Sequence, residues 1–261
     1  MNIPEVCGGN MKNRKENIIR ILLQEGKISV KELSEKFAIS EVSIRKDLSD
    51  LENEGRLKRV HGGAIPIKNR FLCKDLEERK VSHLDEKYKI AQKAFDLIEN
   101  NEVIFLDCSS INILLAQLIF NSTKTISVVT NMLEIINILS MKENIHLYAL
   151  QGFFSNKLGG FISPNTKKEL LKFNIDKSFV GCSGVNILKK QVSTDDLEEG
   201  ELKKLAIEVA KEGYLIFEKV KLDTYDFYNY ISLDKIDNII SSLNIEDQER
   251  TILEEMEIKI Y

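Results

Sequence analysis

Apolar and polar positions follow a helical period from residue 30 onward. Val30, Leu33 and Phe37 recur at intervals of three and four, which places them on one face of a helix. Ser29 is a favoured N-cap residue, and Glu32 stands three positions later, so the two can form a capping box. This pattern predicts a short amphipathic helix that begins directly after Ser29.

A second helix is predicted after a turn of three residues, 38–40. Ser40 serves as its N-cap, and Ile44, Leu48 and Leu51 share its inward face at about 100° per residue. Residues 12–24 carry a further apolar stripe, which predicts a supporting helix.

A basic strand, 56–60, is predicted next, followed by a turn at 61–63 and a return strand that starts at 64–65. Together the segments read as a helix-turn-helix with a two-stranded wing.

The outward face of the second helix is basic near its start, while Asp50, Glu52 and Glu54 gather at its far end. A helix that points its N-terminus at DNA combines basic side chains with the positive end of its dipole, as recognition helices do. Helix-turn-helix spacing also occurs in structural hairpins, and a charged face is usually only solvated. Capping, turn length, charge polarity and wing all favour DNA binding here. The predicted DNA-binding residues are Ser29, Lys31, Ser40, Val42, Ser43, Arg45, Lys46, Ser49, Lys58, Arg59, His61, Gly62 and Gly63.

Beyond residue 85 short apolar runs alternate with helical stretches. A helix is expected over 85–98, 111–119 and 133–139, and strands over 103–106, 126–129, 145–150, 177–180, 214–217 and 236–240. Such alternation predicts a doubly wound, largely parallel α/β sheet, with ligands bound at the carboxyl ends of its strands.

Polar and small residues follow these strands. Asp107, Ser109 and Ser110 stand between a strand and a helix, where backbone N–H groups can hold a phosphate. The serines could equally be simple helix caps. Asn131, Gly152 and Ser183 follow later strands, and the run from 193 to 203 places acidic groups at another helix start.

The chain of 261 residues has a net charge of −4, which by itself argues against binding to nucleic acid. The charge is unevenly distributed, however, and divides the chain into two parts. Residues 12–70 hold 14 Lys and Arg against 9 Asp and Glu, a net charge of +5, while residues 71–261 have a net charge of −8. The basic part is suited to attract DNA, and the acidic part limits nonspecific binding. The predicted domains are a winged helix-turn-helix domain at 1–66, a linker at 67–84 and an α/β effector-sensing and oligomerisation domain at 85–261.

Four scattered cysteines, at 7, 73, 108 and 182, form no metal-ligand or disulfide pattern. No segment reaches the ~18 to 20 apolar residues of a membrane span, and the N-terminus does not resemble a signal peptide. We therefore expect a cytoplasmic protein with free thiols, no metal site, no cofactor and no membrane partner.

The run SVKELSEKFAISEVSIRKDLSDLENEGRLKRVHGGA resembles the N-terminal signature of the DeoR family of bacterial transcriptional regulators. That resemblance implies a winged helix joined to a sensor domain similar to sugar-phosphate isomerases, which binds phosphorylated sugars. DCSS at 107–110 resembles the family's Asp-Ser-Gly-Thr loop, VVTN at 128–131 matches, and STDDLEEGELK at 193–203 resembles TxDxxEAxxK. The expected effector-binding residues are Asp107, Ser109, Ser110, Asn131, Gly152, Lys157, Ser183, Glu199, Lys203 and Lys221.

The chain also departs from the family pattern. Serine replaces a usual glycine at 109 and 163, and Gln151 replaces another. Ser183 and Glu218 stand at usual aspartate positions, and residues 223–230 and 244–261 are unlike the pattern. Losing a glycine from a phosphate loop narrows what can approach the backbone, so these differences predict a different effector or weaker binding.

The predicted function is a homo-oligomeric repressor of carbohydrate-metabolism genes that binds double-stranded operator DNA and is released by a phosphorylated sugar. One alternative is an isomerase-like enzyme tethered to DNA, with the acidic groups and Lys203 as acid and base. Ser183 removes a carboxylate that such chemistry needs, so we expect no enzyme. The other alternative is a constitutive DNA-binding protein whose body only oligomerises.

Overall fold

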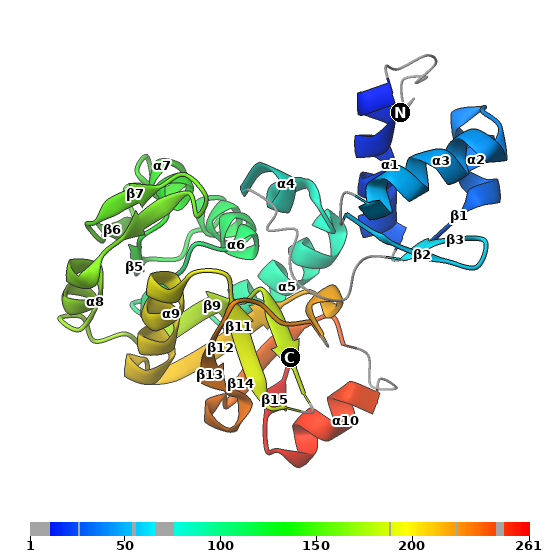
Figure 1. Ribbon diagram of the computed structural model, residues 1–261. Helices are drawn as coiled ribbons and strands as arrows, with labels where there is room; N and C mark the ends of the chain where they lie inside the picture. The colour runs from blue at the N-terminus through cyan, green and yellow to red at the C-terminus, as the bar shows by residue number, and fades with distance from the viewer. Residues whose placement is uncertain are drawn as a thin grey trace. The chain divides into compact units, whose positions relative to one another are not determined.

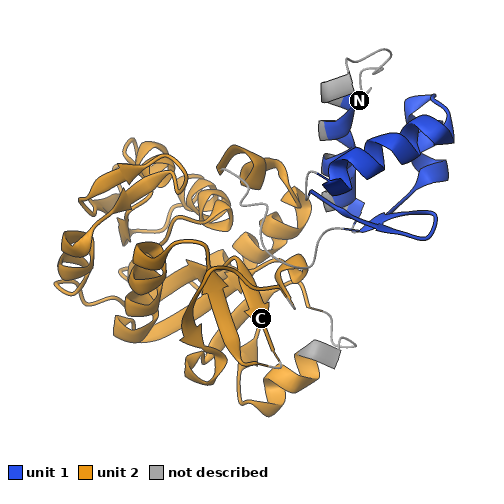
Figure 2. Cartoon of the chain, in the orientation of Figure 1, with its two compact units in different colours: residues 1–72 blue, residues 73–261 orange. Residues whose placement is uncertain are grey.

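The computed structural model describes residues 11–25, 27–53, 56–65, 76–187, 189–222, 224–243 and 248–261. The chain divides into two compact units, Met1–Leu72 and Cys73–Tyr261 (Figure 2). In its described part no helix is long and apolar enough to cross a membrane.

Unit 1 is a winged helix-turn-helix. Its elements in chain order are α1 (Met11–Glu25), β1 (Ile28–Ser29), α2 (Val30–Phe37), α3 (Glu41–Asn53), β2 (Lys58–Val60) and β3 (Gly63–Ile65). The predicted inward residues Ile44, Leu48 and Leu51 are fully buried, together with Ile18 and Leu22 of α1. The capping box of Ser29 and Glu32 is present as predicted.

The sheet of unit 1 has a third strand that the sequence pattern did not predict. Strand β1 pairs antiparallel with β3, with Ser29 opposite Gly63, so the sheet order is β1-β3-β2. A Cβ atom at Gly63 would lie 1.9 Å from the carbonyl oxygen of Ile28. Gly63 is therefore needed for this close pairing of strands.

Unit 2 is built on a seven-stranded sheet of order β15-β14-β12-β9-β4-β5-β6, in which all neighbouring strands are parallel (Figure 1). Its strands are β4 (Val103–Leu106), β5 (Ile126–Thr130), β6 (Ile145–Ala149), β9 (Lys177–Gly181), β12 (Glu212–Phe217), β14 (Asn238–Ser241) and β15 (Lys259–Ile260). The sequence predicted all of these except β15, and the parallel α/β fold is confirmed.

Alternate residues of each strand point to opposite faces of the sheet. Both faces are apolar, and helices cover both of them. Phe179 and Val128 pack in a core with α5 (Leu84–Asp96), α6 (Ser110–Phe120) and α7 (Leu133–Leu139). Val180 and Val129 pack in the opposite core with α8 (Pro164–Leu170), α9 (Leu197–Val209) and α10 (Gln248–Glu255).

Several other features of unit 2 were not predicted. They are the hairpin of β7 (Phe153–Ser155) and β8 (Gly160–Ile162), the antiparallel sheet of β10 (Gly184–Asn186), β11 (Gln191–Thr194) and β13 (Tyr228–Ser232), and the helices α4 (Leu76–Val81), α8 and α10. Helix α4 lies within the predicted linker, of which residues 67–75 fall outside the described residues. The predicted domain boundaries stay a prediction.

The strand order reverses between β4 and β9. From β4 the chain proceeds outward through β5 and β6, and then returns to β9 on the other side of β4 before continuing to β12 and β14. The crevice outside the carboxyl ends of such a strand pair is where doubly wound sheets bind ligands. The residues after β4 and β9 are therefore the first place to look for a sensor site.

Candidate functional sites

The exposed face of α3 carries the predicted DNA-reading side chains. Val42 is 73% exposed, and Arg45 and Lys46 are exposed beside it, whereas Ser43 and Ser49 are half-buried. The side chain of Ser40 accepts a hydrogen bond from the N–H of Ser43 at 3.3 Å, which caps the start of α3 as predicted.

An ion pair with α1 fixes α3 in place. The guanidinium of Arg14 donates two hydrogen bonds to the carboxylate of Asp47, from Nε at 2.6 Å and from Nη2 at 3.0 Å. Asp47 is 2% exposed, and its hydrogen bond and charge raise the pKa of Arg14 above its ordinary value. The sequence interpretation missed this pair, although an aspartate on the buried face of a helix is a signal that a cation must lie opposite.

The wing is connected to the end of the same helix. Glu52 accepts a hydrogen bond from the backbone N–H of Arg59 at 2.8 Å, and the carbonyl of Gly62 accepts one from Val30 at 2.8 Å. Lys58, Arg59 and His61 are exposed along the wing. Gly62 has a φ of +77°, which favours glycine at this turn.

On α2, Lys31 is exposed, while the side chain of Ser29 is engaged as the cap. The exposed part of the predicted DNA-binding set thus lies on α2, α3 and the wing of one unit.

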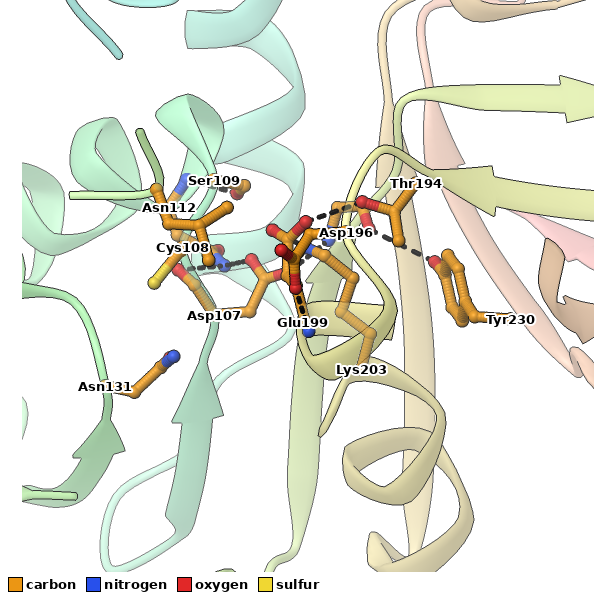
Figure 3. A network of polar contacts seen from close by, with 12 residues as sticks. Asp107, Cys108, Ser109, Asn112, Asn131, Thr194, Asp196, Glu199, Lys203 and Tyr230 are labelled. Carbon is orange, nitrogen blue, oxygen red and sulfur yellow. Dashed lines mark hydrogen bonds and ion pairs between the residues drawn. The ribbon is translucent and has the colours of Figure 1, made fainter. Parts of the chain in front are cut away.

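At the reversal of strand order in unit 2, Asp107 ties three elements together (Figure 3). Its Oδ2 accepts hydrogen bonds from the backbone N–H of Gly181 at 2.8 Å and from Nζ of Lys203. Its Oδ1 accepts a hydrogen bond from the side chain of Asn112 at 2.8 Å, and that side chain also donates to the carbonyl of Phe179 at 2.8 Å. The carboxylate that follows β4 is therefore bonded to the end of β9, to α6 and to α9.

Lys203 lies between two carboxylates. Its Nζ is 3.1 Å from Oε1 of Glu199 in addition to its contact with Asp107, and Thr194 donates a hydrogen bond of 2.5 Å to Oε2 of Glu199. Burial by itself would lower the pKa of Lys203, but the charges of Asp107 and Glu199 outweigh it and hold this pKa above its ordinary value. The raised pKa favours the charged form of Lys203, and two carboxylates already face that charge.

The start of α6 faces the same place. Ser109 caps this helix by accepting a hydrogen bond from the N–H of Asn112 at 3.2 Å, and a Cβ atom at Gly181 would lie 2.7 Å from Cβ of Ser109. Ser110 is the first residue of α6. Cys108 is buried, and burial is the main cause that raises the pKa of its thiol.

The hairpin β7–β8 closes one side of this region. The side chain of Asn131 donates a hydrogen bond to the carbonyl of Phe161 at 2.9 Å, and a Cβ atom at Gly160 would lie 2.3 Å from Sγ of Cys108. In the turn of the hairpin, Nζ of Lys157 is 2.8 Å from Oδ2 of Asp195, which lies just before α9.

The other predicted sensor residues lie around this centre rather than in the network itself. Gly152 packs against β8 and α8, where a Cβ atom would be 2.8 Å from the backbone nitrogen of Ile162. Ser183 hydrogen-bonds through its backbone N–H to Ser193 at 2.9 Å. Lys221 lies beside Glu218, in a separate charged group in which Nζ of Lys87 is 3.2 Å from Oε1 of Glu218.

Burial by itself would raise the pKa of Glu218, but the charges of Lys221 and Lys87 outweigh it and lower this pKa below its ordinary value.

Arg79 of α4 is a cation that the sequence interpretation missed. Its guanidinium donates to the carbonyl of Cys108 and to the carbonyl of Lys157, each at 3.4 Å. Arg79 thus contacts the loop before α6 and the hairpin turn together. It was missed because α4 is short and has no buried residue that would produce an apolar period.

A buried carboxyl group, Asp226, was also missed. Its Oδ1 accepts a hydrogen bond from the N–H of Phe227 at 2.7 Å, while its Oδ2 is enclosed without a hydrogen-bond partner among the described residues. Burial is the main cause that raises the pKa of Asp226, to about 6, although the N–H of Phe227 and, more weakly, the nearby side chain of Ser183 oppose this rise. In the described part of the chain no group of three His, Cys, Asp or Glu side chains could hold a metal ion.

Comparison with known proteins agrees with the division into two units. Residues 14–70 match the family described as the DeoR-like helix-turn-helix domain, and residues 82–242 match the DeoR C terminal sensor domain. The L-fucose operon activator of Haemophilus influenzae is 34% identical over 95% of this chain and 98% of its own length. The lactose phosphotransferase system repressor of Streptococcus mutans is 33% identical over 91% of this chain and 94% of its own length.

Among solved structures, the ribose 5-phosphate isomerase A of Methanocaldococcus jannaschii matches 54% of this chain and 55% of its own, with 19% identity and a TM-score of 0.41. A likeness of this size says nothing about activity.

Proposed function

We propose that this chain, which belongs to the DeoR family of transcriptional regulators, is a repressor of carbohydrate-metabolism genes that binds its operator through α3 and the wing. A phosphorylated sugar bound at the carboxyl ends of β4 and β9 releases it from the DNA. The observation that carries the DNA-binding part is the outward face of α3. Its cations stay exposed while Ile44, Leu48 and Leu51 bury the opposite face.

Arg45 is the first residue to test. Its guanidinium is exposed, and its ion pair with Glu41 of the same helix, at 2.6 Å, also lies on the surface. Because the side chain contributes nothing to the core, the Arg45→Ala variant should fold normally. Specific operator binding should weaken by roughly 1–3 kcal/mol if Arg45 contacts a base, and the loss should be uniform across sequences if it contacts only phosphate.

Lys36→Ala is a matched control, because Lys36 is an exposed cation on α2 that lies outside the predicted surface. Unchanged operator binding by Arg45→Ala would contradict the assignment of α3 as the recognition helix.

The sensor proposal rests on the start of α6 and on the cations around it. A helix N-terminus offers backbone N–H groups that lack partners within the helix, and these groups favour an anion. Arg79 reaches the loop before this helix and retains donors beyond the two that contact carbonyls. Lys203 is less suited to attract a phosphate, because Asp107 and Glu199 already balance its charge.

Thermal-shift measurements with a panel of phosphorylated sugars test the sensor proposal. A ligand at a hundred times its dissociation constant stabilises the folded state by about 2.7 kcal/mol. The corresponding free sugars are the matched control, because they lack the phosphate. A panel that leaves the melting temperature unchanged would count against a phosphorylated sugar as the effector.

We also propose that unit 2 senses its ligand without converting it. A general base must lose its proton near the working pH, whereas neighbouring carboxylates hold the pKa of Lys203 above its ordinary value. Aldose–ketose conversion of a sugar phosphate by the purified protein would refute this. If no metabolite changes the affinity of the protein for its operator, a constitutive DNA-binding protein would instead be favoured.

Two further parts of the proposal concern assembly and location. Helix-turn-helix proteins read two half-sites as symmetric dimers, so we expect a homo-oligomer, which light scattering of the full chain measures. We place the protein in the cytoplasm, where operator DNA is, and cell fractionation checks this.

A further inference from the structure

An exposed apolar side chain stands among the polar residues of the proposed recognition face. Val42 is 73% exposed in the first turn of α3. Among the residues of unit 1 whose side chains the structure describes, it is the one large apolar residue left exposed. Val42 therefore adds nothing to the core of its own domain.

The position of Val42 is well defined, because the turn that carries it is held at several points. Ser40 caps the helix through the N–H of Ser43, and the two hydroxyl groups lie 3.0 Å apart. One turn further on, Asp47 is bound by Arg14. A β-branched side chain in a helix also keeps one strongly preferred rotamer, so the methyl groups of Val42 are presented with little loss of entropy on binding.

The neighbours of Val42 on this face are the residues that read or hold DNA in the proposed function. Arg45 follows it by three positions and Lys46 by four, which places all three side chains next to one another on the helix surface. The carboxylate of Glu41 holds the guanidinium of Arg45 from the side of the preceding turn, at 2.6 Å.

The chemistry of the major groove suggests what Val42 contacts. Base edges there present hydrogen-bond donors and acceptors, and the apolar feature among them is the C5-methyl group of thymine. A valine placed against a polar base edge would remove water from the donors and acceptors of that edge without replacing their hydrogen bonds, whereas contact with a methyl group buries apolar surface on both sides.

We propose that Val42 recognises the 5-methyl group of a thymine in the operator, close to the position that Arg45 contacts. The inference rests on the proposed function, since it requires α3 to lie in the major groove. Because Val42 and Arg45 are adjacent on the helix, the thymine should lie within about two base pairs of the contact made by Arg45.

The test changes the DNA and leaves the protein intact. An operator is first selected from a random duplex library with the wild-type protein, and each thymine is then replaced singly by deoxyuridine, which lacks the methyl group and keeps every hydrogen-bonding group. Dissociation constants are measured by fluorescence anisotropy at one fixed salt concentration.

In the wild type, we expect one thymine per half-site at which deoxyuridine weakens binding roughly three- to fivefold, as expected for one buried methyl group. In the Val42→Ala variant the same replacement should have no effect, because protein and DNA have lost the two sides of one contact. Lys46→Ala is the control: it should weaken binding to both operators alike and keep the sensitivity to deoxyuridine.

Two outcomes would overturn the inference while leaving the proposed function intact. One is that the wild-type protein binds its operator specifically, but no single replacement of thymine by deoxyuridine changes its dissociation constant. The other is a Val42→Ala variant that stays as sensitive as the wild type. If the library yields no preferred sequence at all, the proposed function itself fails, and the inference fails with it.

Discussion

Replacement of Asp226 by asparagine should make the protein more stable at neutral pH. Asp226 is 8% exposed, and one of its carboxyl oxygens lacks a hydrogen-bond partner among the described residues. Asparagine has nearly the same shape and keeps an oxygen that can accept the hydrogen bond from the N–H of Phe227, which measures 2.7 Å. The variant therefore removes the buried charge without removing the packing.

The direction of the pH dependence follows from the raised pKa. In the folded protein the pKa of Asp226 is about 6, against 3.8 for an unperturbed aspartate. The folded state thus holds a proton that the unfolded state has released, and its contribution to stability is present below pH 3.8 and is lost as the pH rises through about 6. At about 1.36 kcal/mol for each pKa unit, the whole effect has an upper limit of roughly 3 kcal/mol.

The assay compares the free energy of unfolding of the two proteins at about pH 5 and about pH 8, by urea denaturation followed by circular dichroism. Relative to Asp226→Asn, the wild type should lose about 1.4 kcal/mol between these two conditions. All other titrating groups are common to both proteins and cancel in the difference.

Asp234→Asn provides the control for this assay. Asp234 is exposed and lies 2.8 Å from Nζ of Lys190, and its hydrogen bond with Lys190 lowers its pKa. Because Asp234 is ionised over this whole pH range in both states, its variant should show no such change. The reasoning on Asp226 is refuted if the difference between wild type and Asp226→Asn is the same at both pH values.

Three other substitutions test the packing of the two units. Lys203→Met leaves Asp107 and Glu199 buried without their cation, and urea denaturation should show a loss of about 3–5 kcal/mol; a fully stable variant would contradict the ion network. Ser29→Ala removes the cap of α2 and should cost about 1 kcal/mol in thermal unfolding, with Lys31→Ala as an exposed control on the same helix. Gly160→Ala places a Cβ atom 2.5 Å from the carbonyl oxygen of Asn131, and calorimetry should show roughly 1–3 kcal/mol of destabilisation, an effect that an unchanged melting temperature would rule out.

The DNA-binding unit could be predicted almost completely from local signals. Helices α2 and α3 follow from the apolar period and from Ser29 and Ser40 as caps, and the wing follows from the turn at residues 61–63. Strand β1 was missed because it has two residues, and it is a strand only because β3 lies beside it.

In the sensor unit, continuous apolar runs revealed the buried parallel strands, because a strand covered on both faces is apolar throughout. The sheet of β10, β11 and β13 was missed. Its strands are short, and its register shifts between Val192 and Ser193, so no regular alternation survives in the sequence.

For the sensor site, the apolar strand patterns predict which residues follow the strand ends and therefore which side chains could meet. Asp107 and Lys203 were both expected near the pocket, and the structure places them in contact. Packing in three dimensions places Asp107 and Glu199 beside Lys203. It also brings Arg79 of α4 to the loop before α6 and buries Asp226, and no local pattern in the sequence indicates either. Periodicity and capping act over a few residues and can be read locally, whereas Asp107 and Lys203 are 96 positions apart and meet only because β4 and β9 are neighbours.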